Sequence, residues 1–97
     1  MLINRDALTL DDLIQVYIEK TGLHEEYELA LIINNWAELV GEKFAEVSKP
    51  DTLKNGVLTT RCSSSVWRSE LFMRRQQIID KINDYRNKEV IKSMVIR

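Results

Sequence analysis

Basic side chains recur along the last third of the chain at spacings that suit contact with phosphate groups. At about 100° per residue, Arg68, Arg75 and Arg86 would share one edge of a helix, and Arg74 and Lys81 the opposite edge. Rows of Arg and Lys on a rigid element suit phosphate contacts, each of which releases counterions. A solvated helix edge, or arginines paired with acidic residues elsewhere in the chain, would give the same pattern. The candidate nucleic-acid contacts are Arg68, Arg74, Arg75, Lys81, Arg86, Lys88 and Lys92.

The charge of the chain is divided unevenly between its two halves. Residues 1–48 carry 3 Lys/Arg against 10 Asp/Glu, a net charge of −7, whereas residues 49–97 carry 11 against 5, a net charge of +6. Such asymmetry indicates a polyanion or another charged partner on the basic half. Pairing of the two halves with each other in the fold is the alternative. Contacts to phosphate alone would give only weak sequence preference.

Three acidic side chains, Glu38, Glu42 and Glu46, stand four residues apart and would form a ladder on one helix face. A solvated face explains them, and so does a docking surface for a basic protein partner. Paired carboxylates that hydrolyse a substrate need a cleft and an opposed geometry, which such a ladder lacks.

Other residue types give no catalytic or cofactor signature. His24 and Cys62 are the only histidine and cysteine, so a structural zinc site has too few ligands and nothing places the two together as a nucleophile pair. The sequence has no glycine-rich phosphate loop of the Walker type. We therefore expect a protein that is not an enzyme and that takes no metal, cofactor or small-molecule substrate.

Length and hydropathy predict a single domain in the cytoplasm. The chain has 97 residues, one proline and three glycines, which leaves little room for a linker. Its longest apolar run, residues 29–33, is far short of the ~20 residues that cross a bilayer. Residues 1–10 lack the pattern of a secretory signal, and the lone cysteine fits a reducing compartment.

Two helices are expected in the acidic half. Thr9 and Asp12 form a capping signal for a helix over about 10–20, which Gly22 would end. A second apolar stripe that includes Trp36 predicts one helix over about 25–47, ahead of Pro50. A glycine inside this stripe, at residue 41, suggests close approach by another backbone element.

The basic half is expected to form two strands, a helix and a last strand. Asn55-Gly56 predicts a type I′ hairpin between strands over 52–54 and 57–62. The serines at 63–65 can cap a helix that contains Trp67 and ends near Asn87, and residues 90–97 are rich in β-branched types. The order helix-helix-strand-strand-helix-strand is α+β, with a small three-stranded sheet covered by helices. A right-handed crossover would make the last strand parallel to its neighbour.

Two tryptophan motifs joined by a hairpin resemble the DciA family over about residues 30–97. The first motif and the proline after it are matched by Trp36, Leu39, Val40, Gly41, Ala45, Ser48 and Pro50. The family hairpin is matched by Leu53, Gly56 and Leu58. The second motif and its helix are matched by Ser65, Trp67, Glu70, Leu71, Ile78 and Asn83. Both tryptophans lie on apolar stripes, so core packing is favoured over stacking on bases.

The resemblance implies a KH-like domain that binds single-stranded or duplex DNA and helps the replicative helicase to load in bacterial DNA replication. A protein-interaction adaptor that binds a replication partner without touching DNA is the alternative. The sequence departs from the family pattern in ending at Arg97, directly after the last expected strand, without the long C-terminal extension common in the family. It also lacks the G-x-x-G loop with which KH domains clamp nucleotides, so another surface must bind.

Overall fold

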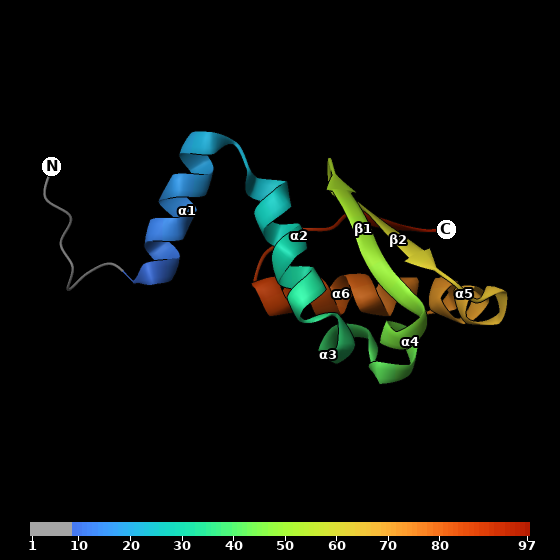
Figure 1. Ribbon diagram of the computed structural model, residues 1–97. Helices are drawn as coiled ribbons and strands as arrows, with labels where there is room; N and C mark the ends of the chain where they lie inside the picture. Colours follow the sequence, from blue (N-terminus) through green and yellow to red (C-terminus); the bar gives the residue numbers. More distant parts are fainter. Residues whose placement is uncertain (1–8) are drawn as a thin grey trace, which may run out of the picture.

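The computed structural model describes residues 9–97, so the first eight residues of the expected 1–97 domain lie outside the described residues. The chain forms, in order, α1 (Leu10–Thr21), α2 (His24–Asn34), α3 (Trp36–Val40), α4 (Glu42–Val47), β1 (Ser48–Lys54), β2 (Val57–Cys62), α5 (Ser65–Met73), α6 (Arg75–Arg86) and β3 (Ser93–Ile96) (Figure 1). The strands make one sheet in the order β1-β2-β3, with β1 antiparallel and β3 parallel to β2. The expected α+β class, the three-stranded sheet and the parallel last strand are confirmed.

Helix α1 begins and ends where its local signals predict. The Thr9 hydroxyl accepts a hydrogen bond from the Asp12 amide (3.1 Å), and the Asp12 carboxylate accepts one from the Thr9 amide (3.0 Å). Gly22 takes the left-handed conformation (φ 74°) just after the last turn, which removes the penalty that a Cβ would bring. The expected helix over 10–20 is therefore confirmed.

The single helix expected over 25–47 is wrong, because the chain breaks at two points and forms α2, α3 and α4 instead. Gly41 lies between α3 and α4 with φ 94° and ψ 152°, a conformation that is essentially restricted to glycine. A Cβ built on Gly41 would meet no described atom within 4 Å, so the expected close approach of another backbone element is also wrong. The glycine is needed for the bend and not for space.

The hairpin between β1 and β2 has the predicted turn. Asn55 (φ 53°) and Gly56 (φ 78°) both take positive φ, as a type I′ turn requires. The carboxylate of Glu25, at the start of α2, accepts hydrogen bonds from both of their amides (3.0 and 2.9 Å). Strand β1 begins at Ser48, four residues earlier than expected, and β3 is shorter than the expected 90–97.

The long helix expected after the serines is also two helices. The Ser64 side chain caps α5, and Arg74 (φ −97°, ψ 5°) separates α5 from α6. Arg68 therefore lies on a different helix from Arg75 and Arg86, and the single edge predicted for these three arginines is wrong. The apolar stripe continues across the break because both helices bury the same side against one core.

The core lies between one face of the sheet and the helices below it in Figure 1. Trp36 is buried, and its indole N–H donates to the Ser48 hydroxyl (3.1 Å), which in turn donates to the Phe44 carbonyl. Trp67 is half-buried and packs edge-on against Phe44, with 5.2 Å between ring centroids. Both tryptophans serve packing, as the sequence favours. The side chains under 2% exposed are Ile32, Leu58, Thr60, Leu71, Ile82 and Ile91.

Substitution of Gly41 by Ala should destabilise the fold by about 1–3 kcal/mol, because a Cβ strains the backbone at this φ. Urea unfolding measures the change. Asn34→Ala, at an exposed position at the end of α2, is the matched control and should stay within about 0.5 kcal/mol of the parent. Equal stability of the Gly41 variant and the parent would contradict the assigned role of the glycine.

Candidate nucleic-acid interface

The sheet has one face in the core and one face with exposed or half-buried side chains. In β2, Leu58, Thr60 and Cys62 point into the core, whereas Val57, Thr59 and Arg61 point away from it. This alternation follows from the two-residue period of a strand. We call the second face the open face; its side chains are Lys49, Thr52, Lys54, Val57, Thr59, Arg61, Ser93, Val95 and Arg97.

Strand pairing aligns three cations across one end of the open face. Lys49 of β1 is the direct partner of Arg61 in β2. Arg97 lies on the other side of Arg61, since its amide donates to the Thr60 carbonyl (2.8 Å) and its carbonyl accepts from the Cys62 amide (2.7 Å). All three side chains are exposed. We call Lys49, Arg61 and Arg97 the basic row.

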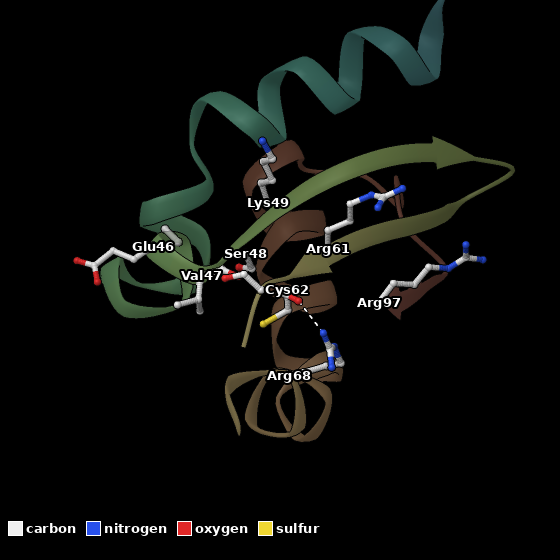
Figure 2. A pocket seen from close by; sticks show the side chains of 10 residues that line it. Glu46, Val47, Ser48, Lys49, Arg61, Cys62, Arg68 and Arg97 are labelled. Atoms are coloured by element: carbon white, nitrogen blue, oxygen red, sulfur yellow. Dashed lines mark hydrogen bonds between the residues drawn. The ribbon is translucent and has the colours of Figure 1, made fainter. Parts of the chain in front are cut away.

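A fourth cation, Arg68 of α5, joins the basic row in a groove at the end of the sheet (Figure 2). The groove has a volume of about 590 Å³, and its wall also contains residues 45–48, Cys62 and Ser63. We call it the basic groove. One Nη of Arg68 donates to the Cys62 carbonyl (2.8 Å), which holds the side chain at the groove wall. Its Nε is buried without a hydrogen-bond partner among residues 9–97.

Two carboxylates moderate the charge of the basic groove. Asp51 accepts a hydrogen bond from Arg61 Nε (2.9 Å), but the two side chains are 39% and 68% exposed, so their attraction is well screened. Glu46 lines the groove from α4 and points away from the basic row in Figure 2. Four cations against two carboxylates leave the groove positive, which suits an anionic ligand.

The structure distributes the other predicted contacts over several surfaces. Arg74 and Lys81 both line a smaller hollow of about 250 Å³ between α3 and α6, together with Glu38. Arg75 lies over the Phe72 ring, 4.2 Å from its centroid. Lys92 is exposed beside the hairpin turn, where its Cγ lies 3.1 Å from the position of a Cβ on Gly56. Arg68 alone among the predicted contacts lies in the basic groove.

Arg86 and Lys88 are engaged inside the protein by Glu28 of α2. Arg86 Nε donates to one carboxylate oxygen (2.6 Å), and Lys88 Nζ lies 3.0 Å from the other. The side chains of Glu28 and Arg86 are only 7% and 16% exposed. These two cations pair with the acidic half of the chain, as one of the two alternatives predicted from the sequence requires. Neither is therefore free to bind a phosphate.

The ion pair sets the protonation of Glu28. Burial alone would raise the pKa of this carboxyl, but hydrogen bonds and charge from Arg86 and Lys88 outweigh burial and hold the pKa below its usual range. The same hydrogen bond raises the pKa of Arg86. Glu28 therefore stays ionised at neutral pH and links the acidic half of the chain to the end of α6.

The three glutamates of the predicted ladder are exposed, but they do not lie on one helix. Glu38 belongs to α3, whereas Glu42 and Glu46 belong to α4, beyond the bend at Gly41. The single-helix ladder is therefore wrong. Glu42 and Glu46 share a shallow hollow of about 270 Å³ with Ala37 and Ala45.

Lys49 and Arg61 are not among the contacts predicted from the sequence, and Arg97 enters that prediction only as part of the basic last strand. The two-residue period of a strand already places Arg61 on one face with Val57 and Thr59, so the sequence does indicate that Arg61 points away from the core. Lys49 was missed because the first strand was expected to begin at Thr52. The neighbour of Arg61 on its other side depends on the register of β3, which no local pattern specifies.

Within residues 9–97, no helix is long and apolar enough to cross a membrane. In the same range, no three His, Cys, Asp or Glu side chains gather as they would around a metal ion.

Fold and groove together define a small α+β domain that presents a cationic groove at one end of a mixed sheet. The sequence pattern of the family described as Dna[CI] antecedent, DciA, matches residues 9–96. The chain belongs to the DciA family, whose members are replicative-helicase loader proteins without an enzymatic activity of their own. The resemblance seen in the two tryptophan motifs is thereby confirmed, as is the non-enzymatic class.

Similar curated proteins carry the name UPF0232. A protein of Rhodococcus jostii is 27% identical over 93 residues, which cover 96% of this chain and 50% of that protein. One of Mycobacterium tuberculosis is 26% identical over 92 residues, 95% of this chain and 49% of the relative. One of Corynebacterium glutamicum is 30% identical over 78 residues, 80% and 44% of the two chains. The chain thus spans about half the length of these relatives.

Glu28→Gln should lower the free energy of unfolding by about 3 kcal/mol at pH 7, because it leaves the guanidinium of Arg86 largely buried without its counter-ion. Since the pKa of Glu28 is lowered by folding, its carboxylate stabilises the protein fully above the ordinary glutamate pKa, and this contribution is lost as the pH falls towards the lowered value. The difference in unfolding free energy between parent and variant should therefore shrink in acid, as urea unfolding across pH would show. Glu26→Gln, at an exposed position, is the control; a difference that does not change with pH would contradict the ion-pair account.

Proposed function

We propose that this chain binds DNA through the phosphate backbone in the basic groove and serves the loading of the replicative helicase in the cytoplasm. The observation that carries the proposal is the basic row, joined at the groove by Arg68. Lys49 lies in β1, Arg61 lies in β2, and Arg97 follows β3 with its backbone hydrogen-bonded to β2, so the backbone beneath the three cations is set before a ligand arrives. Membership of the DciA family supports the role in replication.

Guanidinium and ammonium groups on a preformed surface suit a phosphate chain. Arg presents a planar fork of donors that matches phosphate oxygens, and Lys adds a point charge. Neighbouring strands stand about 4.8 Å apart, so the basic row brings three cations close enough together to contact one stretch of phosphate backbone. Arg74, Arg75, Lys81 and Lys92 remain proposed as additional phosphate contacts on surfaces outside this groove. Arg86 and Lys88 are withdrawn because Glu28 holds them.

Replacement of Lys49, Arg61 and Arg97 together by Gln should weaken DNA binding by at least about tenfold at moderate salt. Each lost phosphate contact removes about 0.7–0.9 from the slope of log K against log salt, so the slope should fall by about two to three. Fluorescence anisotropy of labelled single-stranded and duplex DNA over a salt series measures both quantities. Binding to different sequences should weaken alike, because phosphate contacts carry no base information.

Lys20→Gln is the matched control, since Lys20 is exposed on α1 in the acidic half. All the substituted side chains are exposed, so unfolding curves should show that each variant folds. Parent protein that gives no salt-sensitive anisotropy change would overturn the proposal. A triple variant that binds as the parent does would remove the basic groove as its site.

A contact with the helicase itself is the second candidate, favoured by the exposed carboxylates of α3 and α4 beside a shallow hollow. Replacing Glu38, Glu42 and Glu46 by Lys should abolish co-purification with the replicative helicase. DNA binding should be retained or strengthened, because Glu46 also lines the basic groove and its replacement adds a cation there. The test is a pull-down from purified components, with Glu26→Lys as the control. Undiminished capture by the triple variant would exclude this surface.

A further inference from the structure

Helix α1 carries an apolar stripe that nothing in the described chain covers. Leu10, Leu13, Val16 and Tyr17 are 74%, 39%, 46% and 62% exposed, although their spacing puts them on one side of the helix. The other side of α1, which includes buried Ile18, packs towards α2. Acidic side chains at positions 12 and 19 border the stripe. We call these four exposed residues the α1 stripe.

A second uncovered apolar surface lies on α5 and the neighbouring strand β3. Val66, Phe72 and Met73 are 72%, 53% and 78% exposed. Phe72 and Met73 line a hollow of about 360 Å³ together with Arg68, Ser69 and Ile96. Arg75 covers part of the Phe72 ring. We call Val66, Phe72, Met73 and this hollow the α5 patch, which is apolar at its centre and bordered by two arginines.

The two surfaces are complementary in kind and in charge. Each exposes large apolar side chains, which monomeric proteins seldom leave together in the open. The segment that holds α1 and α2, residues 9–34, carries six Asp/Glu against one Lys, whereas the α5 patch is bordered by Arg68 and Arg75. Acidic borders of the α1 stripe would thus face basic borders of the α5 patch.

A single molecule cannot bring the two surfaces together in this fold. The protein is elongated, with extents of 55 × 22 × 18 Å, and Figure 1 shows α1 at one end and α5 at the other. Contact between the α1 stripe and the α5 patch must therefore join two molecules. Two elongated copies placed antiparallel, side by side, can make this contact twice, once at each end.

We propose that this chain forms a two-fold symmetric dimer in which the α1 stripe of each copy docks on the α5 patch of the other. A closed pair uses every such surface, whereas a single head-to-tail contact would leave free ends and build filaments. The occupant of both surfaces is a second copy of this chain. The inference does not rest on DNA binding.

Light scattering after size exclusion, with the full chain over a range of concentrations, gives the mass in solution. A particle of twice the 11.4 kDa chain mass is expected at high concentration and low salt, with partial dissociation as salt screens the borders. Larger masses that grow without limit would indicate open head-to-tail assembly. A single-chain mass at every concentration would also overturn the proposal.

Two charge substitutions at highly exposed positions locate the contact. Tyr17→Lys puts a positive charge on the α1 stripe, where it would be repelled by the arginines that border the α5 patch. Met73→Glu puts a negative charge on the α5 patch, where it would be repelled by the acidic residues of α1. Each variant alone should be at least tenfold weaker in dimerisation, while Ile33→Ser, 48% exposed on α2, should dimerise as the parent does. Because these positions are exposed, unfolding curves should match the parent.

Mixing the two variants provides the decisive measurement. A mixed pair keeps one undamaged contact and sets Lys against Glu in the other, so the mixture should regain dimer that neither variant forms alone. Pairing of α1 with α1 would show no such recovery and would overturn the assignment, as would a dimer that neither substitution weakens. DNA anisotropy of the same variants shows whether each still binds DNA, since neither substituted residue lines the basic groove.

Discussion

The parallel pairing of β3 with β2 is the contact on which both the core and the basic groove depend. It sets Met94 opposite Leu58 on the buried face and Arg97 beside Arg61 on the open face. A shift of one residue would exchange the faces, exposing Met94 and burying a guanidinium. Asn83 of α6 holds the segment before β3 in place and so helps to fix this register. Its side-chain oxygen accepts hydrogen bonds from the Val90 and Ile91 amides, and its side-chain nitrogen donates to the Ile91 carbonyl.

The unequal charge of the two halves is used in two ways. Part of it is neutralised inside the fold, where Glu28 meets Arg86 and Lys88 and where Glu25 caps the amides of the hairpin turn. These contacts fasten α2 to the end of α6 and to the sheet. Four other cations, Lys49, Arg61, Arg68 and Arg97, gather at the opposite end of the sheet. Internal pairing and an external anionic ligand, the two alternatives for the charge pattern, therefore apply to different residues.

Sequence signals that act over a few residues predicted the structure well, and those that need the tertiary fold did not. Thr9 with Asp12, and Asn55 with Gly56, specify a helix start and a turn through bonds within four residues. An apolar period cannot distinguish one long helix from two shorter ones folded around the same core, which is why the breaks at Gly41 and Arg74 were missed. Arg86 and Glu28 are 58 residues apart, so their pairing leaves no local trace.

The break at Arg74 also gives Arg68 a position that a continuous helix would not. With α5 turned away from α6, Arg68 lies between the basic groove and the α5 patch and lines both. The hydrogen bond from its guanidinium to the Cys62 carbonyl fixes the side chain, so the same positive charge acts on both surfaces. A phosphate in the groove would neutralise a charge that borders the patch, and a docked α1 would bring carboxylates towards the groove. If the basic groove binds DNA and the α5 patch binds α1 as proposed, the two events are coupled through this one side chain, and by thermodynamic linkage each weakens the other to the same extent.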